Sequence, residues 1–131
     1  MIFDDTGAFY ASAIPDDSDH VAADSWLAAN RQSLITTDYV VDETLTLFKA
    51  RQEYARGIRL GEKLFAGRIA RIESVTAQDF YDAWIVFSRY RDKGWSFTDC
   101  TSRVVMQRLG IHRAFAFDDH FRQFGTVTVV P

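Results

Sequence analysis

Met1-Ile2-Phe3-Asp4-Asp5-Thr6-Gly7 opens the chain as a short apolar run that ends in two carboxylates, a hydroxyl and a glycine. Ile2 and Phe3 predict a buried strand, because apolar residues this close to a chain end need a sheet to cover them. Asp5-Thr6-Gly7 then predicts a turn at the carboxyl end of that strand, followed by a helix. Ligands of open α/β sheets bind just beyond such strand ends, so Asp5 is a candidate site residue. Capping of the next helix is the alternative role for these acids.

The rest of the chain alternates short β-prone segments with longer helical ones. We expect helices over 20–32, 40–48, the basic stretch 51–71, 76–93 and 98–109, a short helix before Gly125, and strands near 34–37, 69–75, 114–117 and 126–130. Strands that alternate with helices imply right-handed crossovers and a mainly parallel sheet between helical layers. The sequence therefore predicts a single α/β domain over residues 1–131, a three-layer α/β/α sandwich with a sheet of about five strands.

The composition restricts the class of protein more than it restricts the function. Hydrophobic residues make up 47% and charged residues 25% of the 131, which is ordinary for a globular domain. The single cysteine, Cys100, excludes an intrachain disulfide and a multi-cysteine zinc site. A net charge of -3 argues against nucleic-acid binding by overall charge, but not against a nuclease that holds cations. With no leader and no membrane-spanning run, we expect a cytoplasmic protein without membrane contact.

Acidic residues recur at places that a parallel sheet would bring together. The run 114–117 ends in Asp118-Asp119-His120, which repeats the pattern at the start of the chain. Glu43 lies in a predicted helix that Asp38 would cap, and Asp99 lies in the first turn of a helix that Thr98 would cap. Each acid also has a structural alternative: Glu43 can face water, and Asp99 can interact with the helix dipole. His120 could pair with Asp118 as a metal ligand, but we expect it to be a packing or surface residue.

Four carboxylates at one sheet edge would repel one another by a few kcal/mol per pair at an effective dielectric near ~20. A proton or a divalent cation must offset that repulsion. An all-oxygen set without cysteines or paired histidines fits Mg²⁺ or Mn²⁺ better than zinc. Because carboxylate-held magnesium commonly acts on phosphates, a metal-dependent phosphodiesterase or nuclease is the natural chemistry.

Four segments of the chain carry a resemblance to a known family. They are Ile2-Phe3-Asp4-Asp5-Thr6-Gly7-Ala8-Phe9, Thr37-Asp38-Tyr39-Val40-Val41-Asp42-Glu43-Thr44, Ser96-Phe97-Thr98-Asp99 and Ala116-Phe117-Asp118-Asp119-His120-Phe121. In this order and spacing the sequence resembles PIN-domain ribonucleases of the VapC type, the toxins of toxin–antitoxin pairs. The resemblance implies a metal site made by four acids, with two supporting hydroxyls: Asp5, Glu43, Asp99 and Asp118, with Thr6 and Thr98. Asp119 replaces Asp118 if the last motif is shifted by one residue.

The same resemblance implies a fold, a reaction and partners. We expect a PIN-like sheet, cleavage of RNA by metal-activated water, a cognate antitoxin laid across the active-site groove, and a homodimer. Two positions depart from the family pattern: Asp4 stands where a strand residue is usually apolar, and Ala116 replaces a hydroxyl residue. The basic stretch 51–71 and Trp95, taken as exposed, are candidates for RNA contact. Along 76–93, Phe80, Ala83, Trp84, Phe87 and Tyr90 predict an aromatic face buried in the core.

Two other classes of function remain open at this point. One is a phosphatase or phosphoacceptor domain that uses Asp5 as its nucleophile, which would require a lysine near the acids. The other is a catalytically inactive RNA- or protein-binding module whose acids bind metal without turnover.

Overall fold

The computed structural model describes the chain from Met1 to Pro131. Its first half contains β1 (Ile2–Asp4), α1 (Thr6–Ala13), α2 (His20–Ala29), β2 (Leu34–Thr37), α3 (Asp38–Ala50) and α4 (Tyr54–Phe65). Its second half contains β3 (Arg71–Glu73), α5 (Ala77–Arg89), α6 (Phe97–Leu109), β4 (Arg113–Phe115), α7 (His120–Gln123) and β5 (Thr128–Val130). The five predicted strands are therefore all present, although three of them are shorter than the sequence suggested.

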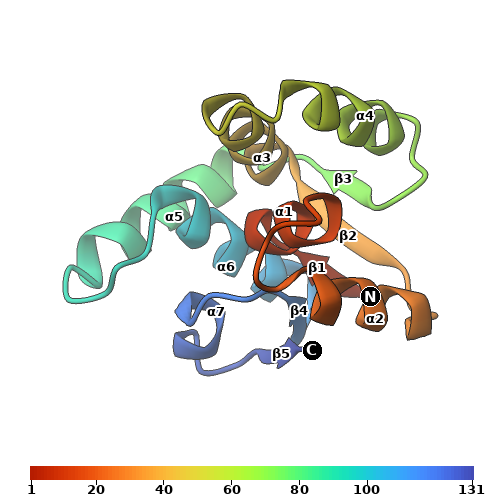
Figure 1. Ribbon diagram of the computed structural model, residues 1–131. Helices are drawn as coiled ribbons and strands as arrows, with labels where there is room; N and C mark the ends of the chain where they lie inside the picture. Colours follow the sequence, from red (N-terminus) through yellow and green to blue (C-terminus); the bar gives the residue numbers. More distant parts are fainter.

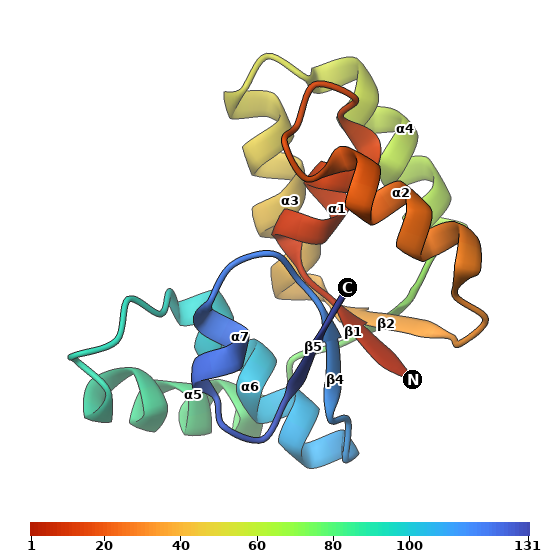
Figure 2. The ribbon, with the colours of Figure 1, turned by 60° about the horizontal axis from the view of Figure 1, so that its bottom comes forward.

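The strands form one sheet in the order β3-β2-β1-β4-β5, and all four pairs of neighbours are parallel. Helices α1 to α4 gather on one side of the strands (Figure 1), and Figure 2 shows α5, α6 and α7 on the other side. The predicted α/β/α sandwich is confirmed, and its sheet is wholly parallel. Since β1 occupies the centre, Ile2 and Phe3 are fully buried, as the opening stretch predicted.

The order of the strands creates a switch point between β1 and β4. From β1 the chain proceeds outward to β2 and β3, and it then returns to build β4 and β5 on the opposite side. The helices that follow β1 and β4 therefore diverge, which leaves a crevice beyond the carboxyl ends of these two strands. Asp5 directly follows β1, and its N–H donates to the Phe115 carbonyl at the end of β4, at 3.2 Å.

Two helix caps differ from the sequence prediction. Helix α3 is capped by Thr37, whose hydroxyl accepts from the Val40 N–H, so Asp38 is the first helical residue. Helix α6 is capped by Ser96 instead of Thr98, and Asp99 is the third residue after the cap. This shift lets Ser96 and Asp99 bond each other's backbone, a reciprocal arrangement that satisfies two N–H groups which a Thr98 cap would leave free.

The prediction of a buried aromatic face on α5 is wrong. Phe80, Trp84 and Phe87 are 49%, 55% and 42% exposed, and only Ala83 of the predicted face is buried. The reason is that α5 lies at the margin of the molecule (Figure 1) and packs mainly against α6. Periodicity identified one face of the helix correctly, but it did not reveal how little of the domain stands opposite that face.

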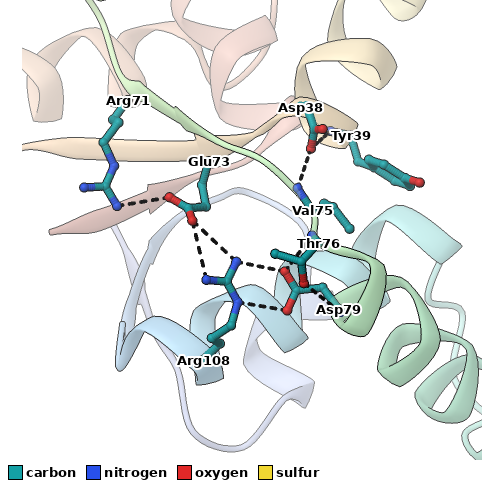
Figure 3. Close-up of polar contacts among 8 residues, drawn as sticks. All are labelled: Asp38, Tyr39, Arg71, Glu73, Val75, Thr76, Asp79 and Arg108. Carbon is teal, nitrogen blue, oxygen red and sulfur yellow. Dashed lines mark hydrogen bonds and ion pairs between the residues drawn. The ribbon is translucent and has the colours of Figure 1, made fainter.

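An ion-pair network joins the connection before α5 to α6 (Figure 3). The Arg108 guanidinium donates from Nε to Asp79 Oδ1 at 2.9 Å and from Nη2 to Asp79 Oδ2 at 2.8 Å. A longer contact of 3.4 Å joins Arg108 Nη1 to Glu73 Oε1. Nearby, the Val75 N–H donates to Asp38 Oδ1 at 2.9 Å. The Arg108–Asp79 bonds fix α5 against α6, the helix that carries Asp99, whereas the Val75–Asp38 bond ties the connection before α5 to α3. None of the helices combines the length and the hydrophobicity that a bilayer span requires.

Candidate active site

A pocket of about 230 Å³ lies at the crevice beyond β1 and β4. All four acids of the predicted site line it, and they come from four different segments of the chain. The lining consists of Asp5, Thr6, Gly7, Glu43, Leu47, Ser96, Asp99, Asp118 and His120. Asp5 and Asp118 follow the ends of β1 and β4, whereas Glu43 and Asp99 come from α3 and α6. The fold thus brings these acids to one place although they span most of the sequence.

Two hydroxyl groups hold Glu43 toward this pocket. The Thr6 hydroxyl donates to Glu43 Oε2 at 2.8 Å, and the buried Thr44 hydroxyl donates to Thr6 Oγ1 at 3.1 Å. Thr6 is therefore used as both donor and acceptor, which fixes the direction of its hydroxyl hydrogen. Glu43 does not face free solvent, so of its two alternatives the structure places it on the pocket side.

Asp99 is held through one of its two oxygens. The Ser96 N–H donates to Asp99 Oδ2 at 3.0 Å, and His120 Nδ1 lies 2.8 Å from the same oxygen. With its Nδ1 as the donor, His120 satisfies a carboxylate that is only 8% exposed. Both contacts fall on Oδ2, so the orientation of the carboxylate is set while Oδ1 makes no hydrogen bond within the protein.

The last motif has the register in which Asp118 lines the pocket. Asp118 Oδ1 accepts from the His120 N–H at 3.0 Å, and its side chain is 45% exposed. Asp119 points away: its side chain is 84% exposed and lies 3.3 Å from Arg122. Thr98 is not part of the lining either, and Ser96 takes its place. Asp119 and Thr98 are thus the two predicted residues that the structure does not bring into this pocket.

Burial and repulsion oppose ionisation of the acids. Burial raises the pKa of Asp5 well above its usual value, and the charges of Asp118 and Asp99 raise it further. Burial is also the largest cause of the raised pKa of Glu43, partly offset by the hydrogen bond from Thr6. The pKa of Asp99 is raised for the same reason, although the bonds from Ser96 and His120 counteract it. The pocket therefore favours a positive charge placed among these acids.

An oxygen-only donor set of this kind fits a hard divalent cation such as Mg²⁺ or Mn²⁺. The type of the side chains and their common pocket support this fit. In this structure, however, no three acidic, histidine or cysteine side chains are spaced closely enough to form a complete metal centre. Cys100 contributes no ligand: it is fully buried, and burial raises the pKa of its thiol to about 11. It packs as a small buried hydrophobe.

Two residues near the site differ from their predicted roles. His120 was expected to pack or face solvent, but it lines the pocket and contacts Asp99. Its position two residues after Asp118 was the only signal for this in the sequence. Trp95 is only 7% exposed, and its indole N–H donates to Gln123 Oε1 at 2.9 Å, so the expectation of an exposed RNA contact is wrong. The residue is a core aromatic with one satisfied polar atom.

Residues 2–127 match the family described as PIN domain. The chain belongs to the PIN domain family. A curated PIN-domain relative, the 23S rRNA-specific endonuclease VapC20 of Mycobacterium tuberculosis, is 33% identical over 131 residues, covering 100% of this chain and 99% of the relative. The crystal structure of that organism's VapC20, described as a sarcin-ricin loop cleaving toxin, superposes with a TM-score of 0.92 at 31% identity and full coverage of both chains. This PIN domain is thus a VapC-type toxin ribonuclease.

A more distant solved structure extends the comparison of folds. FitAcB from Neisseria gonorrhoeae superposes with a TM-score of 0.67 at 16% identity, covering 100% of this chain and 97% of the other. At that identity the likeness concerns the arrangement of helices and strands alone. The PIN-like fold predicted from the sequence is confirmed by the family match and by the VapC20 structure.

Proposed function

We propose that this PIN domain is a Mg²⁺- or Mn²⁺-dependent endoribonuclease in which Asp5, Glu43, Asp99 and Asp118 form the metal-binding and catalytic site. One observation carries the assignment of these residues. Carboxylates from four separate segments line a single pocket, and their burial and mutual repulsion leave it in need of a cation. No lysine or arginine lines this pocket, which removes the partner that a phosphoacceptor site at Asp5 would need.

The substrate we propose is a structured loop of ribosomal RNA. A relative that is 33% identical over its whole length is a 23S rRNA-specific endonuclease, and its solved form is described as a sarcin-ricin loop cleaving toxin. Recognition of a folded loop also suits a domain with a net charge of -3, because shape and local contacts can replace a strong overall attraction to phosphates.

The side chains of the site have separable tasks. When bound, the cation lowers the pKa of a coordinated water and neutralises charge on the scissile phosphate. Thr6 keeps Glu43 turned toward the pocket, and Ser96 with His120 keeps Asp99 in place. One of these carboxylates accepts a proton from the attacking water as its oxygen bonds to phosphorus. One P–O ester bond breaks, and its oxygen leaves as a hydroxyl after gaining a proton.

Cleavage of ribosomal RNA by the purified protein, with Mg²⁺, Mn²⁺ or EDTA, tests this proposal. We expect cutting with metal, none in EDTA, and a loss of about a hundredfold or more in Asp5→Asn and Asp99→Asn. Asp119→Asn is the matched control, since it removes an equivalent charge next to Asp118 and outside the pocket, and it should cut normally. Unchanged cutting by Asp99→Asn would refute the site. Hydrolysis of small phosphate monoesters, with RNA left intact, would indicate a phosphatase.

We also propose a cognate antitoxin, a homodimer and a cytoplasmic location, as expected for a VapC-type toxin. The exposed aromatic face of α5 supports the dimer, because Phe80, Trp84 and Phe87 leave apolar surface that a second copy can cover. Sedimentation of the wild type and of Trp84→Glu tests this: we expect a dimer and a monomer, respectively. A monomeric wild type at micromolar concentration would contradict it.

A further inference from the structure

Asp4 lines a second cavity, on the other side of β1 from the active site. Asp4 and Asp5 are consecutive, so in an extended chain their side chains leave opposite faces. Asp4 lines a cavity of about 330 Å³ with residues of α1, α2 and α4, among them Phe9, Leu60, Arg59 and Lys63. We refer to it as the Asp4 cavity. Its volume lies within the range of small-molecule sites, roughly 300–1,000 Å³.

Asp4 is a buried acid whose carboxylate finds no partner within the chain. The residue is 2% exposed, and its Oδ1 is buried without any hydrogen bond. By contrast, its backbone carbonyl accepts from the Thr36 hydroxyl at 2.8 Å. Buried polar atoms are almost always paired, because an unpaired one loses its hydration without compensation. The mechanism proposed above does not use Asp4, so this oxygen remains to be explained.

The entrance of the Asp4 cavity has the opposite charge. Arg59 and Lys63 both line it, stand one helical turn apart on α4 and are exposed. Neither of them lies within 4.0 Å of an acidic group, whereas Arg56 beside them pairs with Glu53 at 3.0 Å. Leu60 and Phe9 contribute apolar wall to the same cavity. A ligand that matches this order has an anionic end outside, a flat apolar body, and hydrogen-bond donors at its inner end.

We propose that the Asp4 cavity binds a guanine nucleotide of the RNA substrate, with the base edge at Asp4 and a phosphate at Arg59 and Lys63. Guanine carries adjacent N1–H and N2–H₂ donors on its Watson–Crick edge. They match the two oxygens of one carboxylate once the Asp4 side chain turns its covered Oδ1 toward the cavity. RNA-binding proteins commonly read unstacked bases along this edge. A basic peptide fits less well, since its cation would have to pass Arg59 and Lys63 to reach Asp4.

The position of the cavity allows one RNA strand to reach it and the active site together. Thr6 and Gly7 at the start of α1 line the active-site pocket, and Phe9 and Ser12 further along the same helix line the Asp4 cavity. Helix α1 has 8 residues and is therefore roughly 12 Å long. This inference rests on the proposed function only in taking RNA as the substrate; the binding itself needs no metal.

Titration of the full-length protein with GMP, IMP, AMP, CMP and UMP in EDTA, followed by amide NMR, tests this proposal. We expect GMP to shift the amides of Phe9 and Ser12 and to bind about tenfold or more tightly than IMP, which lacks the N2 amino group. Asp4→Asn replaces one acceptor by a donor in the same shape, so the affinity for GMP should fall about tenfold or more while that for AMP changes little.

The variants at the entrance separate recognition of the phosphate from recognition of the base. Arg59→Gln should weaken all five nucleotides alike, and Arg68→Gln, an exposed arginine outside the lining, should weaken none. Equal affinity for GMP and IMP in the wild type would overturn the proposal, and this comparison needs no variant. Absence of binding, or displacement of GMP by an arginine-rich peptide through Asp4, would overturn it as well. Asp99→Asn should still bind GMP, so failure here is distinct from failure of the nuclease assignment.

Discussion

Replacement of Arg108 by methionine should destabilise the domain without touching the active-site pocket. The substitution keeps most of the apolar stem but removes the guanidinium that pairs with both oxygens of Asp79 at 2.9 and 2.8 Å (Figure 3). The Asp79 side chain is 2% exposed, so its charge remains buried after the change. Only the Thr76 N–H, and any water that enters, would then donate a hydrogen bond to the Asp79 carboxylate.

The expected cost follows from these contacts. Loss of the partner of a buried carboxylate costs about 3–5 kcal/mol when the site is dry. Because the Arg108 side chain is 36% exposed, solvent screens the pair and can partly replace it, which lowers the figure to about 2–3 kcal/mol. For a chain of 131 residues, this corresponds to a fall in Tm of roughly 7–11 °C.

Urea unfolding at several pH values provides the measurement. Burial raises the pKa of Asp79, but the bonds from Arg108 and Thr76 lower it by more, so its pKa lies below the usual value. A lowered folded-state pKa adds stability above the unfolded-state pKa of about 4 and loses it as the pH falls through the folded value. The difference between wild type and Arg108→Met should therefore be constant from neutral pH to about pH 5 and shrink below about pH 4.

The double variant Arg108→Met with Asp79→Asn is the control, since it removes the buried charge together with its partner. It should recover part of the loss, because a neutral amide is cheaper to bury than a carboxylate. A loss below ~0.5 kcal/mol in Arg108→Met, or one that does not change with pH, would refute the argument that this pair stabilises α5 against α6.

Three further predictions concern the site and the helix layer. Asp5→Asn should raise the free energy of unfolding in EDTA by about 0.5–2 kcal/mol. Burial and the neighbouring acids raise the pKa of Asp5 in the folded state, so this gain in stability should vanish in thermal unfolding experiments as the pH falls to about 4. His120→Ala should weaken Mn²⁺ binding about 10- to 100-fold by calorimetry, since Asp99 loses its ring partner, and His120→Asn should restore part of it. Gly57→Ala should cost about 1–2 kcal/mol in urea melts, because the new Cβ would lie 3.0 Å from Phe48 Cβ.

The sequence was sufficient where the structure depends on local chemistry. Ile2 and Phe3 had to be covered, and a strand in the centre of a parallel sheet is the place that covers them on both faces. The helix predicted from residue 76 begins with a hydroxyl and an acid three residues apart, and Thr76 and Asp79 form a capping box there. Gly110 ends α6 in the left-handed conformation, with φ of 67°, as a glycine after a helix suggests.

The sequence was insufficient for features that depend on which other residue or element lies next to a side chain in the fold. The aromatic face of α5 has a helical period whether it packs on a sheet or faces outward, and Trp84 is 55% exposed. The cap of α6 depended on two competing hydroxyls, and Ser96 prevailed because Asp99 returns its bond. The role of His120 required the distance to Asp99, 21 positions earlier in the chain, which no local pattern contains.

The two acids at the end of β1 show how one strand can serve two cavities. Asp5 is useful because the switch point beyond β1 and β4 places other carboxylates around it, whose charges raise its pKa. Burial, and after it the charge of Asp5, also raises the pKa of Asp4, but the cavity that Asp4 lines presents apolar side chains and cations instead of further acids. Adjacent side chains of an extended chain point to opposite faces, so the acids at positions 4 and 5 meet different sets of neighbouring side chains. On the proposal made above, the acid at position 4, where the family usually has an apolar residue, builds a second polar site on the same strand end.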